Sequence, residues 1–344
     1  MNRTTLTLTA VTLMMLSFGL VLLPLAAPVR AETLGTWNST SAIPQTVDTE
    51  GMSCVVSGSD IFCVGGFTDG APTDVTYYAS YSSSGIGTWQ TGTDYPTIIY
   101  LPSCVAEGGY ITCVGGLVEP GAETAAVYSA PISSSGIGAW TLTTPYPTDM
   151  EATSCVTNNS QITCIGGLTG IGFNTAATYH ATIVDGVVGA WTQEASYPMN
   201  IEGQSCFETD EPSSTYVTCV GGQYNPLLSE DITPNAYVDS ITNGILGSTW
   251  TPTTGFPYPL SFDPCWDYGA TFSTTYTYCI AGYTESGGMY VYYSLDSSGA
   301  LGAWAQTTAY PTQVTATLQC VSPFDGYFYC TGGEPAESAS YYTQ

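Results

Sequence analysis

Positive charge is almost absent from this sequence. Its only Lys or Arg residues are Arg3 and Arg30, against 28 Asp and Glu residues, and it has a single histidine, His180. Both arginines fall within the first 31 residues, and every carboxylate lies at or after Glu32. Beyond residue 31 the chain therefore carries 28 carboxylates and no Lys or Arg, which gives it a formal charge of −28.

This lack of positive charge excludes several partners and several kinds of enzyme. A nucleic acid cannot bind, because no side chain is available to replace the counterions of its phosphates. A sialidase needs arginines to hold the carboxylate of its substrate, and a copper oxidase needs more than one histidine. His180 falls at an ordinary strand position, where we expect a surface or packing role. Carboxylates with pKa values of about 4 suit an acidic or cation-rich exterior.

Long apolar runs are confined to the N-terminus. The stretch 6–27 is mostly apolar, and Val29-Arg30-Ala31 places small residues at the spacing of a cleavage site before Glu32. This pattern predicts a secretory signal peptide over residues 1–31, with an uncleaved anchor as the alternative. No later run of roughly 20 apolar residues could span a bilayer, so we expect a secreted, extracellular or cell-surface protein.

Cysteine, in contrast, is plentiful and regularly spaced. The 12 cysteines form six close pairs: Cys54/Cys63, Cys104/Cys113, Cys155/Cys164, Cys206/Cys219, Cys265/Cys279 and Cys320/Cys330. Zinc ligands usually lie about two to four residues apart, which is closer than the members of these pairs. In a secreted chain the spacing therefore predicts six disulfides.

The cysteine pairs belong to a longer repeat. Tryptophans recur at intervals of 52, 51, 51, 59 and 54 residues, at Trp37, Trp89, Trp140, Trp191, Trp250 and Trp304. Each is followed by an X-Pro step, a first Cys, a polar turn, and a second Cys that runs into two small residues, as in CVGG at 63–66. Each unit also holds a tyrosine in a β-prone run, at Tyr77, Tyr128, Tyr179, Tyr237, Tyr292 and Tyr341.

The order of these landmarks predicts four short antiparallel strands in each unit. The first strand carries the first Cys, the second ends at the Gly pair, the third carries the Tyr and the fourth carries the Trp. The X-Pro steps are Ile43-Pro44, Tyr95-Pro96, Tyr146-Pro147, Tyr197-Pro198, Tyr258-Pro259 and Tyr310-Pro311. Six such units predict an all-β fold, a six-bladed β-propeller of four-stranded blades.

The same landmarks resemble the Kelch family of repeats. The Gly pair that ends the second strand, the Tyr, the Trp and the X-Pro step follow the Kelch order over essentially all of residues 32–344. The resemblance implies a single propeller domain over this range. The sequence departs from the family pattern in two ways: Tyr-Pro replaces the usual Met-Pro, and no Arg follows the Pro.

The two ends of the repeat region complete one another. The last unit stops after its third strand, at 341–344, and LGTW at 34–37 is a fourth strand without a unit of its own. We therefore expect the N-terminal strand to close the sixth blade, which removes two exposed sheet edges. In the alternative, this strand pairs with a neighbouring molecule and the protein is a subunit of an extracellular array or filament.

One recurring motif could be mistaken for a catalytic signature. SSSGIGTW at 82–89 returns as SSSGIGAW at 133–140. The aspartate box of sialidases places Asp two residues before a Gly and an aromatic residue three after it. Gly85 and Gly87 instead lie four and two residues before Trp89. We interpret the motif as a hairpin corner between the third and fourth strands, with the Trp packed between blades.

Carboxylates remain as candidates for a functional site. The fourth residue after the Pro of the X-Pro step is acidic in four of six units, at Asp48, Glu151, Glu202 and Asp263. The preceding residue is apolar in all six units, so the acidic residues should face the other way, near one mouth of a central channel. Oxygen ligands of this kind suit Ca²⁺, so these four are candidate metal ligands. A solvated polar loop is the other interpretation.

These features together favour a non-catalytic protein. We expect a secreted binding or scaffold propeller that recognises an extracellular protein or polysaccharide. A glycoside hydrolase is the catalytic alternative, because two carboxylates about 5 or 6.5–9.5 Å apart suffice for that reaction. Two close carboxylates with a strongly shifted pKa in a tyrosine-lined pocket would favour the enzyme, and dispersed acids would favour the binder.

Overall fold

The computed structural model describes most of the chain beyond the predicted signal peptide. The described residues are 33–44, 51–68, 71–119, 121–211, 214–225, 231–271, 274–281, 290–297, 299–312, 317–323, 326–333 and 339–344. The predicted signal peptide (1–31) and Asp48 lie outside them. The chain divides into two units, Met1–Thr33 and Leu34–Gln344, and all the strands belong to the second. Within the described residues no helix is long and apolar enough to cross a membrane.

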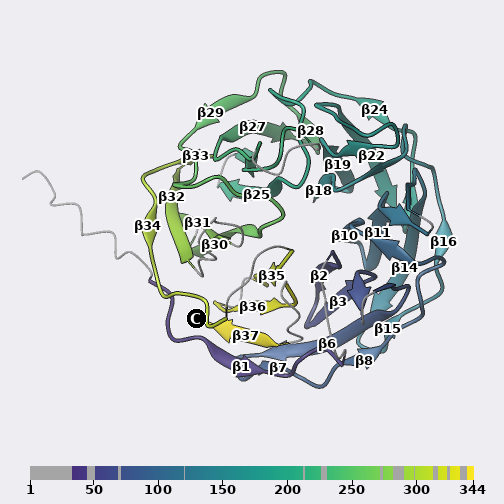
Figure 1. Ribbon diagram of the computed structural model, residues 1–344, viewed down its shortest axis with the longest axis horizontal. Helices are drawn as coiled ribbons and strands as arrows, with labels where there is room; N and C mark the ends of the chain where they lie inside the picture. The colour runs from purple at the N-terminus through teal and green to yellow at the C-terminus, as the bar shows by residue number, and fades with distance from the viewer. Residues whose placement is uncertain are drawn as a thin grey trace, which may run out of the picture. The chain divides into compact units, whose positions relative to one another are not determined.

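Six antiparallel sheets of four or five strands make up most of the unit Leu34–Gln344 (Figure 1). The inner strands, which lie around the centre, are β2 (Ser53–Ser57), β10 (Ser103–Glu107), β18 (Ser154–Asn158), β25 (Ser205–Glu211), β30 (Cys265–Thr271) and β35 (Gln319–Val321). The second strands are β3 (Asp60–Val64), β11 (Tyr110–Val114), β19 (Gln161–Ile165), β26 (Ser214–Val220), β31 (Thr274–Ala281) and β36 (Phe328–Thr331). The third strands are β6 (Thr76–Ser82), β14 (Val127–Ser133), β22 (Thr178–Val184), β27 (Ala236–Thr242), β32 (Tyr290–Ser297) and β37 (Ser340–Thr343).

The fourth position of each sheet lies at the rim and is split in five of the six sheets. The two short strands that share it are β7 (Gly85–Ile86) with β8 (Gln90–Thr91), β15 (Gly136–Ile137) with β16 (Thr141–Leu142), β23 (Val187–Val188) with β24 (Thr192–Gln193), β28 (Ile245–Leu246) with β29 (Thr251–Thr253), and β33 (Ala300–Leu301) with β34 (Ala305–Gln306). The tryptophan lies between the two short strands, so the predicted single strand through it is wrong.

The N-terminal strand completes the remaining sheet. Strand β1 (Asn38–Thr40) pairs antiparallel with β37, and Ser39 lies opposite Tyr341. Just before it, Gly35 N–H donates to the carbonyl of Gln344 at 2.7 Å. The predicted closure of the last sheet by the N-terminus is therefore confirmed, although β1 follows Trp37 instead of containing it.

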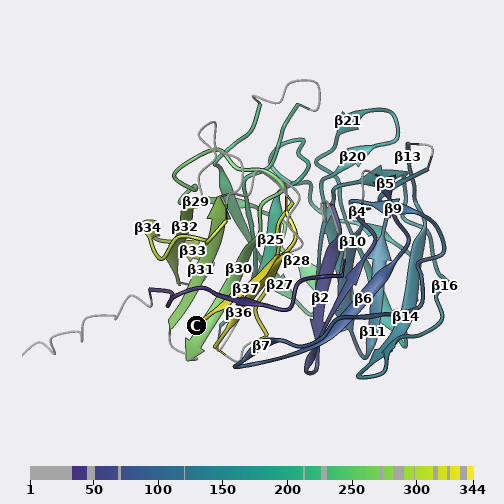
Figure 2. The same cartoon turned by 60° about the horizontal axis from the view of Figure 1, so that its bottom comes forward.

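Three smaller sheets follow the Gly pairs. They are formed by β4 (Phe67–Thr68) with β5 (Ala71–Pro72), by β9 (Ile99–Tyr100) with β12 (Leu117–Val118) and β13 (Ala122–Glu123), and by β17 (Met150–Glu151) with β20 (Leu168–Thr169) and β21 (Phe173–Asn174). Figure 2 shows β4, β5, β13, β20 and β21 along one edge of the unit and β7 at the opposite edge. We call the first edge the hairpin face.

The Gly pair is required where the chain leaves a second strand for the hairpin face. Gly115 has a φ of +64°, and a Cβ there would lie 2.5 Å from the carbonyl oxygen of Met150. Gly116 N–H donates to that same oxygen at 2.8 Å. A side chain would therefore collide with the backbone of the next repeat, and it would be strained by a backbone conformation that only glycine adopts readily.

All six predicted disulfides are present. They join Cys54–Cys63, Cys104–Cys113, Cys155–Cys164, Cys206–Cys219, Cys265–Cys279 and Cys320–Cys330. Each links an inner strand to its second strand at directly opposite positions. Because the bridges close loops of 9 to 14 residues, each stabilises the fold by roughly 2–3 kcal/mol. Six such bridges suit an oxidising environment outside the cytoplasm.

The inner strands contact one another in a closed cycle, in the order β2, β10, β18, β25, β30, β35 and back to β2. Three residues before the first Cys of each repeat, the backbone is left-handed, with φ between +51° and +63°, at Gly51, Leu101, Ala152, Gly203, Phe262 and Thr317. The N–H of each of the last five donates to the carbonyl oxygen of the one before it, at 2.7 to 3.3 Å. We call this chain of hydrogen bonds the inner belt.

A second series of hydrogen bonds connects the disulfides to neighbouring sheets. The hydroxyl of the Ser that precedes each first Cys accepts the N–H of the next first Cys, at 2.9 to 3.0 Å, in Ser53–Cys104, Ser103–Cys155, Ser154–Cys206 and Ser205–Cys265. Gln319 Oε1 accepts the N–H of Cys54 in the same way at 3.3 Å. In an antiparallel pair that exchanges no hydrogen bonds, the N–H points away from the partner strand. Each of these Cys N–H groups is therefore satisfied by the preceding sheet of the cycle.

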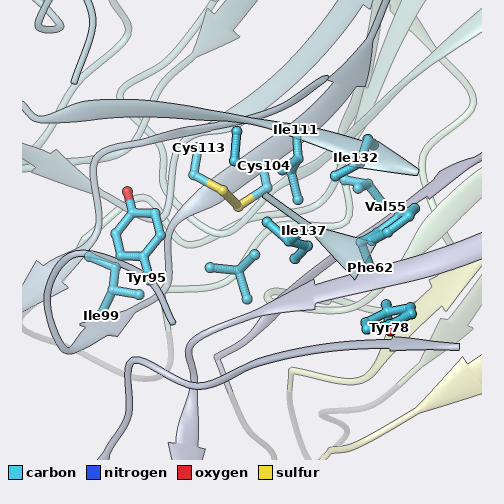
Figure 3. Close-up of a cluster of buried hydrophobic side chains, with 12 residues drawn as sticks. Val55, Phe62, Tyr78, Tyr95, Ile99, Cys104, Ile111, Cys113, Ile132 and Ile137 are labelled. Atoms are coloured by element: carbon cyan, nitrogen blue, oxygen red, sulfur yellow. A yellow bond between two sulfur atoms is a disulfide. The ribbon is translucent and has the colours of Figure 1, made fainter. Parts of the chain in front are cut away.

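Aromatic rings join the outer parts of neighbouring sheets. Trp140 packs edge-to-face on Tyr95 of the preceding repeat with ring centroids 4.8 Å apart, and its Nε1–H donates to Thr93 O at 3.0 Å. The same ring pair recurs at Trp37–Tyr310, Trp191–Tyr146, Trp250–Tyr197 and Trp304–Phe256. Figure 3 shows the apolar cluster at the first of these interfaces, with Tyr95 and Ile99 near the Cys104–Cys113 bridge. The tryptophans therefore pack between sheets, as predicted.

The SSSGIGTW motif is a corner between two sheets. Gly85 has a φ of +103°, and a Cβ there would lie 2.4 Å from Thr40 Oγ1. Ile86 N–H donates to the same hydroxyl oxygen at 2.6 Å. Because β7 lies at the edge opposite the hairpin face (Figure 2), the motif is also remote from the hairpins described above. The structural interpretation of the motif is confirmed.

Replacing Ser154 by Ala should destabilise the fold measurably. The change leaves the N–H of Cys206 without its 3.0 Å partner, which costs about 1–2 kcal/mol. We expect Ser154→Ala to lower Tm by roughly 2–6 °C in calorimetry of the oxidised protein. Ser84→Ala, in an exposed turn, is the control and should leave Tm unchanged. An unchanged Tm for Ser154→Ala would show that the bond between sheets contributes nothing.

Candidate functional site

The structure brings together two of the four predicted acidic residues. Glu151 lies on β17, opposite Leu168 of β20. Glu202 exchanges two main-chain hydrogen bonds with Gln223, at 3.0 and 2.8 Å. Each therefore lies where the chain enters one repeat and meets a segment that follows a Gly pair. Asp48 lies outside the described residues.

The predicted register of the fifth repeat is wrong by two residues. Phe256 is the ring that packs on Trp304, at 5.0 Å, and its N–H donates to Pro234 O as that of Tyr197 donates to Ala176 O. The equivalent X-Pro step is therefore Phe256-Pro257, and Tyr258-Pro259 is an extra step that follows it. Ser261, four residues beyond Pro257, takes the position of Glu151 and Glu202, and Asp263 does not.

Asp263 instead lines the cavity at the centre of the unit. This cavity of about 210 Å³ receives one short segment from each repeat, at 51–53, 101–103, 152–154, 203–205, 262–265 and 317–320. Its lining includes the inner belt and the Ser side chains that bind the Cys N–H groups, but neither Glu151 nor Glu202. Glu151 and Glu202 each directly precede a lining residue, Ala152 and Gly203. The acids therefore border the cavity lining without belonging to it, and a ring of acids at the mouth of a channel stays a prediction.

Glu151 and Glu202 are buried and carry shifted pKa values. Their exposed fractions are 9% and 5%. Burial, with smaller contributions from the charges of Glu123 and Glu202, raises the pKa of Glu151 from 4.5 to about 7. Burial also raises the pKa of Glu202 to about 7, against a hydrogen bond with Asn174 that lowers it. Neither carboxyl has a Lys or Arg to pair with, since residues 33–344 contain none.

Asn174 connects the two glutamates to the hairpin β20–β21. It is 6% exposed, and its Nδ2 donates to Gln223 O at 2.6 Å. Asn174 Oδ1 and Glu151 Oε2 are both buried without a hydrogen-bond partner. Sequence reasoning missed Asn174, because its role depends on a contact with the following repeat. The one available signal was its position seven residues after Gly167, which matches that of Glu123 after Gly116.

The tip of this hairpin presents large apolar side chains to solvent. Ile171 and Phe173 are 80% and 63% exposed. Gly172 N–H donates to Thr169 O at 2.7 Å, and Thr169 Oγ1 donates to Phe173 O at 2.8 Å, which closes the turn. Tyr224, two residues after the next Gly pair, and Tyr258 are also more than 40% exposed. Repeats three to five therefore contribute three exposed aromatic rings from segments next to the Gly pairs and X-Pro steps.

Two other sequence predictions concern metal and histidine. Within the part of the chain that the structure describes, no group of three or more His, Cys, Asp or Glu residues could hold a metal ion. A Ca²⁺ site at Asp48, Glu151, Glu202 and Asp263 stays a prediction, and the structure does not bring its described members into one group. His180 lies on the third strand β22 with Nδ1 against Glu194 Oε1, both largely buried, as expected for a packing residue.

The chain should be more stable in acid than in mild alkali. The folded-state pKa values of Glu151 and Glu202, about 7, lie above the ordinary 4.5, so their stabilisation is complete below pH 4.5 and lost as pH rises through 7. Each contributes at most roughly 3 kcal/mol. We expect calorimetry in low salt to give a higher Tm at pH 4.5 than at pH 8. Glu151→Gln should raise Tm at pH 8 by about 2–4 °C and leave it unchanged at pH 4.5. A higher Tm at pH 8 in the parent would contradict this account.

Comparison with known proteins identifies a fold and no family. No protein-family model and no curated protein sequence matches the chain. Among solved structures, that of YjhT matches with a TM-score of 0.65 over 88% of this chain and 95% of that chain, at 11% sequence identity. At this identity the match shows the fold alone. Because 560 solved chains match, the fold is widely shared and does not by itself indicate an activity. The chain thus has an all-β fold of sheets shaped like propeller blades.

Proposed function

We propose that the protein is a secreted, six-bladed, Kelch-like β-propeller that binds a neutral extracellular polysaccharide through its hairpin face, without catalysis. The closed cycle of inner strands supports six blades. The recurring Gly pair, Tyr and Trp support the Kelch type. The six disulfides support secretion, since they suit an oxidising compartment. The hairpin face, with its exposed rings, is the surface that supports binding.

The exposed side chains of the hairpin face carry this proposal. Phe173, Tyr224 and Tyr258 come from three successive repeats, and their exposed fractions are 63%, 44% and 43%, so much of each ring is available to a ligand. Flat aromatic rings bury apolar sugar faces, and Tyr hydroxyls add hydrogen bonds. Rings on successive repeats suit a chain of sugars, because each ring can contact a different unit of the same polymer.

Charge decides which polysaccharide fits. The chain from Glu32 onwards has a formal charge of −28 and no Lys or Arg, so it repels an anionic polymer. A neutral polymer meets no such repulsion, and its hydroxyls can donate to the many carboxylates and carbonyls of the surface. A protein partner would have to be basic to benefit from the same charge, which makes it the alternative that the binding test must distinguish.

Glycoside hydrolysis is the second candidate, favoured by the raised pKa values of Glu151 and Glu202. That reaction needs one protonated carboxyl and one ionised carboxylate at the same pH. Pairs of this kind are recognised by environments that push their pKa values apart. Here burial pushes both values in the same direction, to about 7. The pair therefore has no assigned acid and no assigned nucleophile, and binding accounts for the site better.

A glycan-binding experiment tests the proposal. The oxidised parent should bind one or more neutral polysaccharides on an array, and Phe173→Ala with Tyr224→Ala should weaken that binding roughly 30-fold, because each stacked ring contributes about 1 kcal/mol. Reducing ends should not accumulate when the same polysaccharide is incubated with the parent at pH 4.5 to 8.

The matched control places the same kind of change at another exposed apolar site. Val184 and Val187, 62% and 64% exposed in the hairpin between β22 and β23, can be changed together to Ser. This variant should bind like the parent. Equal loss of binding in both variants, binding only to basic proteins, or steady release of reducing ends would each contradict the proposed function.

A further inference from the structure

The hairpin β20–β21 is anchored at its base by the two buried glutamates. Glu151 of β17 lies opposite Leu168, in the first strand of the hairpin. Glu202 pairs with Gln223, whose carbonyl accepts the side-chain amide of Asn174, in the second strand. Both strands that carry the exposed tip are therefore attached to a segment that holds a glutamate.

Every charged group packed around this base is negative. Glu123 on β13 acts on Glu151 from the preceding repeat. Asp149, just before β17, accepts Ala125 N–H at 2.9 Å and lies beside Gly170 of the hairpin. On the other side, Asp231 accepts hydrogen bonds from Tyr224 and Asn225 at 3.1 and 2.7 Å. The chain's one histidine, His180, is occupied by Glu194, so no positive side chain is available to either buried glutamate.

The surroundings of Glu151 suit a neutral carboxyl better than a charged one. Glu151 Oε2 is buried without a partner, so an ionised carboxylate would have no counter-charge and no hydrogen bond at that atom. Such a charge is strongly unfavourable in a protein interior.

We propose that protons on Glu151 and Glu202 hold the hairpin β20–β21 in its binding form, so that ligand binding at the hairpin face takes up protons and weakens as both carboxyls ionise. This inference rests on the proposed binding function. The raised pKa values fix its direction: the closed hairpin is favoured fully below pH 4.5 and loses this support as pH rises through about 7.

Hydrogen exchange tests the structural half of the proposal without a ligand. We expect the amides of residues 166–176 in the parent, corrected for intrinsic exchange rates, to lose about tenfold in protection between pH 5 and pH 8. The neighbouring hairpin β18–β19 should not change. In the variant with both Glu151→Gln and Glu202→Gln, which mimics the neutral carboxyls, protection should be equal at the two pH values.

A matched variant separates this effect from general charge reduction. Glu119→Gln with Asp185→Asn removes two exposed charges elsewhere and should behave like the parent. Equal protection of the parent hairpin at pH 5 and pH 8 would overturn the proposal. So would a pH response that persists in the double Gln variant or disappears in the control. The parent's own response decides the matter even if the double Gln variant does not fold.

Binding measurements test the functional half with a glycan found on the array. The parent's affinity should fall about tenfold from pH 5 to pH 8, in step with the hairpin, and the double Gln variant should bind equally at both. An affinity that is equal at pH 5 and pH 8, while the exchange protection of the hairpin changes, would overturn the coupling between the two. If no glycan binds and the hairpin still responds, the proposed function fails and the proton-dependent hairpin remains.

Discussion

The structure depends on satisfying the exposed edge of each inner strand. A four-stranded sheet leaves one row of N–H and C=O groups unpaired on its innermost strand, and these groups need partners when they are buried. In this chain, neighbouring sheets supply them twice over. The inner belt joins left-handed residues from Gly51 to Thr317 through main-chain bonds, and Ser or Gln side chains accept the N–H groups of the first cysteines. The disulfides hold together the two strands of each sheet whose Cys N–H groups point toward the neighbouring sheet.

The inner belt and the Ser–Cys hydrogen bonds explain how six sheets hold together in a chain without ion pairs of Lys or Arg. They also place no constraint on the sequence of the hairpin face. The belt and the disulfides occupy the centre, and the Trp and X-Pro rings occupy the interfaces farther out. The segments after the Gly pairs form no part of the belt, the disulfides or these ring pairs. They differ in length and composition among repeats. Among those that the structure describes, the segment of repeat three combines an exposed Phe173 with an anchored Asn174. These segments are therefore where we propose that the ligand binds.

Sequence reasoning succeeded where the same side chain performs the same task in each repeat. Cysteine, tryptophan and glycine recur because their roles need a thiol, a large ring or a left-handed backbone. The disulfides, the packing of the tryptophans between sheets and the order of the strands could therefore be predicted. The inner belt could not, since main-chain atoms form it and its residues share no side-chain type, as Leu101, Ala152 and Phe262 show. The fifth repeat has two X-Pro steps in a row, and the sequence prediction uses the second as the equivalent one. It therefore assigns Asp263 to a position that Ser261 occupies. The pairing of Glu202 with Asn174 was beyond prediction because it joins different repeats.

The most direct test of this account is amide hydrogen exchange at the inner belt. The N–H groups of Leu101, Ala152, Gly203, Phe262 and Thr317 border the central cavity, and their sheets give them no partner in register. If they bond to the preceding repeat, they should exchange only through global unfolding, as slowly as the amides of the second strands. Exchange as fast as that of the exposed Gly108 turn would show that the sheets are not joined at their inner edges, and the account would be wrong.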